Sequence, residues 1–215
     1  TLFPTEIKKY DPYVIREVLN NCIAHQDYRL NGKINIVEFP NKLIFSNLGL
    51  FLPGTVENVI SQEGPQERYR NPFLAEAMVN LNMIDTIGSG IRKMIDTQIK
   101  RYFPLPEFDF TKAPDGAPRV QVTIIGEVLD INYTKLLVNN TNLSIEEIML
   151  LDKLQKGQRI SKVDADYLRS KKLIEGRYPN VYVPSNIAEV TNTRGKYLDR
   201  VGFNNMHYKE LILEY

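Results

Sequence analysis

Three polar residues near the start of the chain, Glu17, Asn21 and His25, recur at steps of four. At about 100° per residue in a helix, this spacing places them in one stripe. Valine, leucine, isoleucine and cysteine residues between positions 14 and 23 form a wider apolar band, so residues 16–28 predict a half-buried helix with a polar stripe at the rim of a core. There Glu17 could polarise a water molecule, and the Asn21 amide oxygen could ligate Mg²⁺. The alternative is ordinary hydrogen bonding at a core boundary.

The segments after this helix predict a pair of strands and a loop. A turn signal at residues 31–32 precedes residues 33–39, whose alternation predicts a half-buried strand. Residues 43–49 predict a second strand that runs into a loop. The glycines of residues 49–55 have the spacing of a Walker A loop, but the segment lacks the lysine that would reach the phosphates, which excludes a P-loop.

Another helical pattern and a pair of glycines follow. Arg70-Asn71-Pro72 precedes a helix whose apolar positions we expect on one face, namely Phe73, Leu74, Ala77, Met78 and Leu81. Gly88-Ser89-Gly90 then stands before a further helix. Glycines at the start of a helix let backbone amides approach a phosphate, although such glycines also serve simply to turn the chain. Residues 103–118 are proline-rich and predict irregular structure, and residues 120–125 predict a strand.

These motifs occur in an order that resembles a known family. The segments that carry the resemblance are Arg16-Glu17, Asn21, His25, Asp27-Tyr28, Asn47-Leu48-Gly49, Arg70-Asn71-Pro72 and Gly88-Ser89-Gly90-Ile91. They resemble the ATP-binding portion of bacterial AlbA/Schlafen-type transcriptional regulators, also labelled RecG-like or divergent AAA proteins. That portion is similar to the GHKL ATPases, the class of gyrase, MutL and the histidine kinases. The resemblance covers roughly residues 10–126 and implies a Bergerat-type fold that binds ATP and Mg²⁺. It also implies that Glu17 is the general base and Asn21 the magnesium ligand.

The resemblance implies further nucleotide contacts, one of which departs from the GHKL pattern. Asn47 and Gly49 would flank the adenine, and the later Gly-x-Gly would close on the phosphates. GHKL ATPases place an aspartate in an Asp-x-Gly box to read the adenine amino group, whereas Asn47 has an amide that both donates and accepts hydrogen bonds. Arg70, Asn71 and His25 are candidate phosphate or lid contacts, with salt bridges and helix caps as the alternative.

Residues 128–186 predict a winged-helix domain. A connecting helix is expected first, and Ser144-Ile145-Glu146-Glu147 is a capping box for the next helix. Residues 161–173 predict another helix, with Val163, Tyr167 and Leu168 facing inward. Residues 173–184 predict a hairpin that turns at positions 178–180. Helices followed by a two-stranded wing are typical of winged-helix domains.

Basic residues accumulate in this second part of the sequence. Residues 153–177 contain eight Lys or Arg residues against three acidic ones, a local excess of five positive charges. The residues expected to contact double-stranded DNA are Lys162, Arg169, Lys171, Lys172 and Arg177. The alternatives are a solvated helix face and a winged helix that contacts only protein.

Composition limits the other possibilities. The chain has 215 residues, 43% hydrophobic and 25% charged, as globular proteins do, and its net charge of +1 argues against a globally basic surface. It shows neither a membrane span nor a signal peptide, and its single cysteine, Cys22, excludes a disulfide framework. These features predict a cytoplasmic protein that does not bind a membrane. Because the sequence begins at Thr1 and stops within a helical pattern, we expect it to be part of a longer protein.

The sequence therefore predicts an α+β protein with three parts. Residues 1–127 are expected to form a divergent GHKL-like nucleotide-binding domain, residues 128–186 a winged-helix domain, and residues 187–215 a helical extension. The function expected is a transcriptional regulator that binds ATP with Mg²⁺ and contacts double-stranded DNA, with a second copy of the chain as a further candidate partner. The alternatives are an ATP hydrolase that remodels DNA and a scaffold that no longer binds nucleotide and only dimerises.

Overall fold

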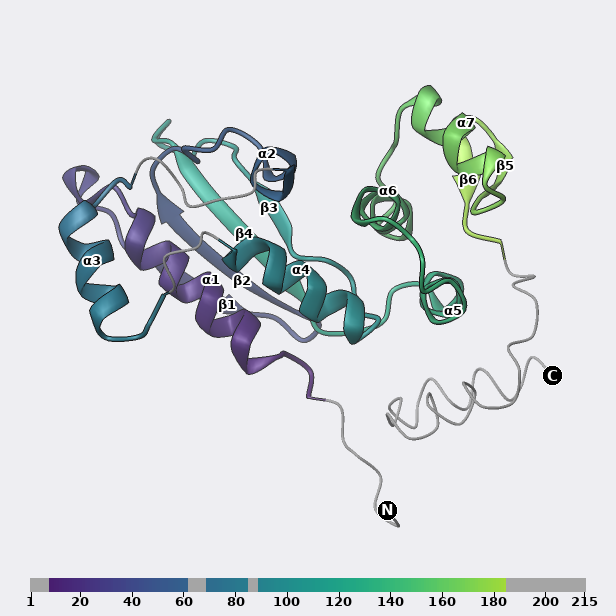
Figure 1. Ribbon diagram of the computed structural model, residues 1–215. Coiled ribbons are helices and arrows are strands. Elements are labelled where there is room, and N and C mark those ends of the chain that lie inside the picture. The colour runs from purple at the N-terminus through teal and green to yellow at the C-terminus, as the bar shows by residue number, and fades with distance from the viewer. Residues whose placement is uncertain (1–7, 62–68, 85–88, 185–215) are drawn as a thin grey trace, which may run out of the picture. The chain divides into compact units, whose positions relative to one another are not determined.

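The computed structural model describes residues 8–61, 69–84 and 89–184 (Figure 1). The chain divides into two compact units. Tyr10–Val128 is the first unit, and residues 129–184 are the main described part of the second unit. Gly88 and the expected helical extension lie outside the described residues. The domain limits expected from the sequence stay a prediction.

An antiparallel sheet forms the centre of the first unit. Its strands are β1 (Asn35–Glu38), β2 (Lys42–Leu48), β3 (Glu107–Asp109) and β4 (Arg119–Ile125), in the spatial order β1-β2-β4-β3. β2 and β4 are the long central pair, with Phe45 opposite Val122. The mixed α+β class expected from the sequence is confirmed, and the sheet is consistent with a GHKL-like ATPase-type domain.

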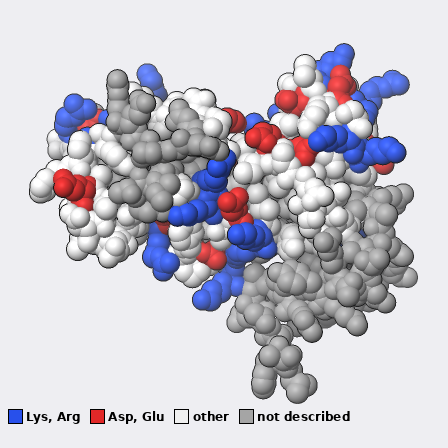
Figure 2. Space-filling view, viewed as in Figure 1, with Lys and Arg blue, Asp and Glu red and all other residues white. Residues whose placement is uncertain are grey.

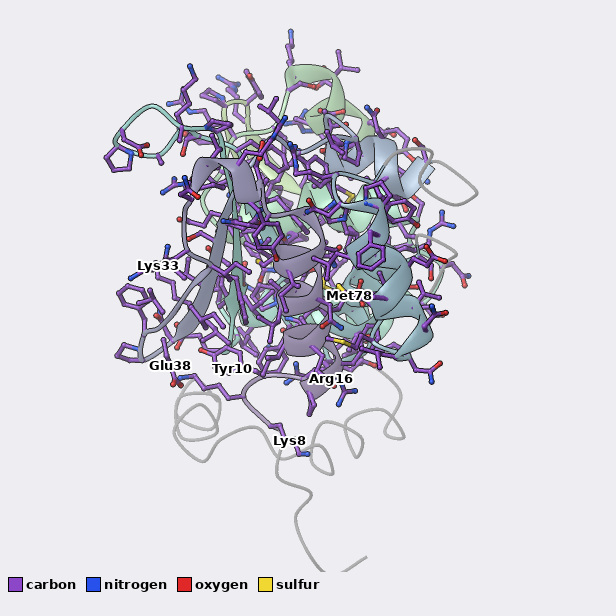
Figure 3. All side chains as sticks on the ribbon, turned by 90° about the vertical axis from the view of Figure 1, so that its left-hand side faces the viewer. Lys8, Tyr10, Arg16, Lys33, Glu38 and Met78 are labelled. Carbon is purple, nitrogen blue, oxygen red and sulfur yellow. The ribbon has the colours of Figure 1, made fainter. Side chains whose placement is uncertain are left out.

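Helices α1 (Pro12–His25) and α4 (Gly90–Lys100) lie across one face of this sheet (Figure 1). The remaining elements of the first unit are the 3₁₀ turn η1 (Tyr28–Leu30), α2 (Val56–Ser61) and α3 (Pro72–Asn80). α1 begins where the Asp11 carboxylate accepts hydrogen bonds from the first free backbone amides, and it buries Val14, Val18 and Cys22. Figure 3 shows α1 between the sheet and α3, whose Met78 is buried.

Three expectations about this unit are wrong. Strand β1 is exposed rather than half-buried, because it is an edge strand of the sheet and Ile36 and Val37 keep 51% and 46% of their surface. The apolar face expected for α3 is wrong in part: Met78 is buried as expected, but so is Ala75, whereas Phe73 and Leu81 are 85% and 71% exposed. The segment expected to be irregular contains β3, which is held in place by its pairing with β4.

The second unit contains three helices followed by a hairpin. They are α5 (Ile131–Asn139), α6 (Ile145–Gln155), α7 (Lys162–Ser170), β5 (Glu175–Arg177) and β6 (Asn180–Tyr182). The capping box of α6 is confirmed, since Ser144 accepts from the Glu147 amide while Glu147 accepts from the Ser144 amide. The inward face expected for α7 is partly wrong. Ala165 and Leu168 are buried, but Val163 is 78% and Tyr167 45% exposed, because only the former pair faces the core.

Candidate functional site

The polar stripe of α1 meets the start of α4. The side-chain amide of Asn21 donates to the Glu17 backbone carbonyl at 2.7 Å and to Glu17 Oε1 at 2.9 Å, so it fixes the position of that carboxylate. A Cβ atom on Gly90 would overlap the Glu17 carboxylate. The Glu17 carboxylate can therefore lie this close to the start of α4 because Gly90 has no side chain. Residues that are 73 positions apart thus meet at one point.

A pocket lies beside this contact, between α1, α4 and the sheet, and we call it the helix–sheet pocket. The empty space in and around it, open solvent included, is about 530 Å³. Its polar lining residues are Asn21, His25 and Asn47. The others are apolar: Val18, Cys22, Leu50, Phe51, Leu52, Pro53, Ile91, Met94, Phe108, Val120 and Val122. An apolar cavity with a few convergent polar groups is the usual form of a small-molecule site.

The polar groups of the pocket keep acceptors for a ligand. No donor in the described part of the chain bonds to the amide oxygen of Asn21, whose nitrogen is already used by Glu17. Asn47 is 4% exposed, and its nitrogen donates to the Leu48 carbonyl at 3.3 Å, which leaves its oxygen as the acceptor. The pocket can therefore offer two amide oxygens, one on α1 and one on β2.

His25 and Cys22 bring no charge to the pocket near neutral pH. Burial, with the nearby Arg70 charge, lowers the pKa of His25, so the imidazole is neutral. Burial raises the pKa of the Cys22 thiol to about 12, which leaves no reactive thiolate. Neither residue therefore repels or attracts a ligand by charge.

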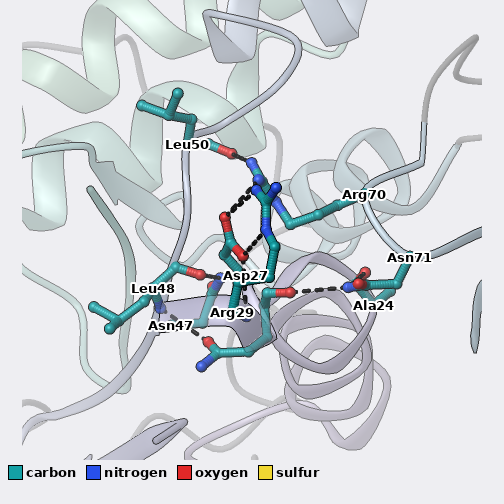
Figure 4. Close-up of polar contacts among 9 residues, drawn as sticks. Ala24, Asp27, Arg29, Asn47, Leu48, Leu50, Arg70 and Asn71 are labelled. Carbon is teal, nitrogen blue, oxygen red and sulfur yellow. Dashed lines mark hydrogen bonds and ion pairs between the residues drawn. The ribbon is translucent and has the colours of Figure 1, made fainter. Parts of the chain in front are cut away.

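A hydrogen-bond network holds the loop that follows β2 against the end of α1 (Figure 4). The Asp27 carboxylate accepts from Arg29 Nε at 3.0 Å and from Arg70 Nη1 at 3.2 Å, and Arg70 Nη2 donates to the Leu50 carbonyl at 2.8 Å. The Asp27 amide donates to the Leu48 carbonyl at 2.7 Å. Hydrogen bonds from Arg29, with the Arg70 charge, lower the pKa of Asp27 to about 2, so this carboxylate is ionised. The network thereby positions Leu50, which lines the pocket.

Arg70, Asn71 and Gly49 take part in this network. The Asn71 amide donates to the carbonyls of Ala24 and Gln26 at 3.0 and 2.8 Å and so caps the end of α1. A Cβ on Gly49 (φ 136°) would press on the His25 carbonyl and on Arg70. These bonds match the alternative of salt bridges and caps, and a contact of Arg70 or Asn71 with phosphate stays a prediction. Ser89 is the N-cap residue of α4.

Three residues at this site, Gln26, Phe51 and Phe108, were not predicted from the sequence. Gln26 accepts from the Leu48 amide at 2.9 Å and, with Asp27, joins α1 to β2. Phe51 and Phe108 line the pocket from a loop and from β3. Asp27, beside Gln26, was part of the family motif, but no local pattern indicates where the phenylalanine rings meet.

Two of the five expected DNA contacts are engaged within the second unit. Arg169 bonds to Asp166 at 2.8 Å and to the Gly176 carbonyl at 2.9 Å, which ties α7 to the hairpin. Lys171 pairs with the buried carboxylate of Glu147, and this pairing raises the pKa of Lys171. The other three, Lys162, Lys172 and Arg177, are exposed. Figure 2 shows that basic and acidic side chains are interspersed on the visible face of this unit.

The residues present fit a magnesium ion that is held partly by a ligand. No cluster of three His, Cys, Asp or Glu side chains that could hold a metal occurs among residues 8–61, 69–84 and 89–184. Mg²⁺ commonly takes one or two protein oxygens and completes its shell with phosphates and water. The Asn21 amide oxygen has the chemistry of such a ligand, and a magnesium contact there stays a prediction.

None of the described helices has the length and apolar character that a bilayer span needs.

Comparison with known proteins supports the first unit's assignment. Residues 31–124 match the family model described as "Putative ATP-dependent DNA helicase recG C-terminal". The match supports a RecG-like, ATPase-type domain in this part of the chain. The match includes the sheet, Asn47 and α4 but begins after α1, so the RecG-like match itself does not include Glu17, Asn21 or His25.

A solved structure resembles the chain beyond the RecG-like domain. The DIP2311 protein from Corynebacterium diphtheriae matches 82% of this chain with a TM-score of 0.50 and 19% identity. At this identity the likeness concerns the fold alone. The chain spans 41% of the length of that protein. No curated protein is significantly similar to the chain.

Proposed function

We propose that the first unit binds ATP with Mg²⁺ in the helix–sheet pocket. The observation that carries this proposal is the contact at the pocket's edge, where Asn21 holds the Glu17 carboxylate against Gly90. The base would enter the apolar part of the pocket and meet Asn47, and the phosphates would lie toward the start of α4, where backbone amides favour an anion. Asn21 would hold Mg²⁺, which would neutralise phosphate charge.

Asn47 bears on which base is bound. Its nitrogen is directed to the Leu48 carbonyl, so its oxygen is available to accept a hydrogen bond, as the aspartate of the GHKL pattern does. An amino group on the base, as in adenine, satisfies that oxygen. The substitution of amide for carboxylate therefore removes charge without removing the acceptor.

Calorimetric titration with ATP and Mg²⁺ tests this proposal. Wild-type protein should release heat on binding, and Asn21→Ala should weaken binding ~10-fold because a cation ligand is lost. Asn35→Ala on the exposed strand β1 is the matched control and should bind as wild type does. Absence of heat with the wild type, or equal affinity of Asn21→Ala and Asn35→Ala, contradicts the assignment.

ATP hydrolysis is the second candidate function. It is favoured by the bond from Asn21 to Glu17 Oε1, which orients a carboxylate that could take a proton from water. Steady phosphate release by the wild type, abolished in Glu17→Gln while ATP still binds, would establish it. Binding without phosphate release would leave a nucleotide-binding regulator, and failure to bind would leave the dimerisation scaffold.

For the second unit we propose a winged helix that contacts double-stranded DNA, in a transcriptional regulator of the AlbA/Schlafen type. The order of three helices and a hairpin supports this proposal, as do the exposed basic side chains of Lys162, Lys172 and Arg177. Nucleotide binding would regulate that contact, and a homodimer is the expected assembly. Anisotropy of a labelled DNA duplex should rise with added protein, and the titration midpoint should move when ATP and Mg²⁺ are added.

A further inference from the structure

Three phenylalanine rings from two distant segments gather at the helix–sheet pocket. Phe51 belongs to the loop after β2, Phe108 to β3, and Phe110 follows that strand. The rings of Phe51 and Phe110 are stacked, with centroids 4.7 Å apart and planes 17° apart. Phe108 is tilted against both, at centroid distances of 6.4 Å from Phe51 and 6.5 Å from Phe110. We call these residues the aromatic wall.

The aromatic wall lies at the edge of the core, since Phe51 and Phe108 are half-buried and Phe110 is exposed. Phe110 keeps 39% of its surface, and the neighbouring pocket residues Leu50 and Leu52 keep 66% and 44%. Core clusters bury their large apolar side chains, whereas these residues form an open apolar edge. Such an edge beside a cavity is a place where a flat apolar ligand gains stacking contacts.

The arrangement of the rings separates two roles. Phe51 and Phe108 line the pocket, and Phe110 does not. Phe110 nevertheless stacks on Phe51, so it supports that ring from outside the pocket. The other elements of the lining carry the polar groups Asn21, His25 and Asn47. A ligand with a flat ring and polar edges matches both kinds of lining.

We propose that Phe51 and Phe108 form a stacking surface for the base of the nucleotide, and that Phe110 positions Phe51. This inference rests on the proposed nucleotide binding and adds the residues that select the ligand. A purine should be preferred over a pyrimidine, because its two fused rings cover more of the aromatic surface. Base stacking on aromatic side chains contributes enough that losing one ring weakens binding by ~10-fold or more.

Because the chain contains no tryptophan, a single introduced tryptophan reports on one position. The fluorescence of Phe51→Trp should be quenched by ATP with Mg²⁺ and should not change with tripolyphosphate and Mg²⁺, which lack a base. Phe39→Trp, on an exposed residue beside β1, is the control and should not respond to either. Equal responses of the two variants to ATP, or equal quenching of Phe51→Trp by tripolyphosphate, overturn the inference.

Affinity measurements separate this inference from the proposed function. Phe108→Leu should weaken ATP binding ~10-fold and leave tripolyphosphate binding unchanged, whereas Phe108→Tyr should bind ATP as wild type does because it keeps the ring. Thermal unfolding of both variants checks that they are folded. If wild type and folded Phe108→Leu bind ATP equally well, stacking is overturned and nucleotide binding stands. If wild type binds no ATP, both are overturned.

Discussion

The polar side chains of α1 and the basic side chains of α7 and its hairpin were both predicted to bind a ligand, but the structure uses them differently. In the first unit, Asn21 and Glu17 bond to each other and leave the Asn21 oxygen for a ligand. In the second unit, Arg169 and Lys171 use their charges on partners within the unit. Two of the five basic residues are thus engaged while Lys162, Lys172 and Arg177 are exposed, so a count of like charges overestimates the charge that is available to a ligand.

The difference has a physical origin in Glu147. This residue caps α6 from within the second unit and is 2% exposed, so its charge needs compensation close by. Lys171 and the Tyr167 hydroxyl supply it. Burial alone would raise the pKa of Glu147, but the hydrogen bonds from Lys171, the Ser144 amide and Tyr167 keep it below its ordinary value. A local excess of basic residues can thus serve the fold.

The largest expected effect tests whether the contact between Glu17 and Gly90 in the first unit belongs to a ligand site. In Gly90→Ala, the new methyl group would displace the Glu17 carboxylate. We expect ATP affinity to fall on the order of 100-fold, because displacements of about 1 Å at such sites have effects of that size. Lys93→Ala, one turn further along α4 and exposed, is the control. Equal affinities of the two variants in calorimetry would mean that the contact is only structural.

The second-largest expected effect tests whether the buried Glu147 explains why Lys171 is engaged in the second unit. Glu147→Ala should lower the free energy of unfolding by about 2–3 kcal/mol, because it removes half of a capping box and leaves Lys171 and Tyr167 without their acceptor. Urea unfolding followed by circular dichroism measures this change. Glu146→Ala, at the neighbouring exposed glutamate, serves as control and should lower the free energy of unfolding by less than about 0.5 kcal/mol. Similar costs for both variants would remove the explanation given for Lys171.

The salt dependence of DNA binding distinguishes available from engaged charges. Each phosphate contact contributes about 0.9 to the slope of log affinity against log salt concentration. Replacing Lys162, Lys172 and Arg177 together by alanine should therefore lower that slope by about 2 to 3. Arg169→Ala should lower it less, because its guanidinium is bonded to Asp166 and Gly176. Anisotropy titrations across salt concentrations test this, and a larger change for Arg169→Ala would contradict it.

Features fixed by neighbours in sequence could be predicted. The capping box at Ser144 and Glu147 joins groups three residues apart, and strand β2 (Lys42–Leu48) lies where residues 43–49 were expected to form a strand. The helix predicted over residues 16–28 ends at His25, since the chain then turns so that the Asp27 amide reaches the Leu48 carbonyl. Local propensity determined these elements, and a tertiary contact determined the boundary.

Features fixed by distant contacts could not be predicted. Strand β3 lies in a proline-rich segment and forms because Phe108 pairs with Val122 of β4. Its ring then reaches Phe51, so half of the pocket's aromatic lining depends on sheet order, which the sequence pattern does not reveal. The exposure of Phe73 likewise depends on which side of α3 meets α1. Spacing on one helix predicted Glu17 and Asn21, but their partner Gly90 was tied to them only by resemblance.

The smallest expected effect concerns pH, because the first unit has His25 to titrate near neutral pH and the described part of the second unit has no histidine. The pKa of His25 is lowered from its ordinary value of 6.5, so the unfolded chain binds this proton first as the pH falls. His25 therefore stabilises the first unit above that value, and this contribution is lost on going from about pH 7.5 to about pH 5.5. His25→Gln should remove that part of the change in the urea midpoint. The described part of the second unit has no histidine, and its Glu147, whose pKa lies below the ordinary value of 4.5, loses its contribution only in more acidic solution. An unchanged midpoint between the two pH values in wild type, or the same change in His25→Gln, would mean that the imidazole is hydrated and does not face the closed pocket.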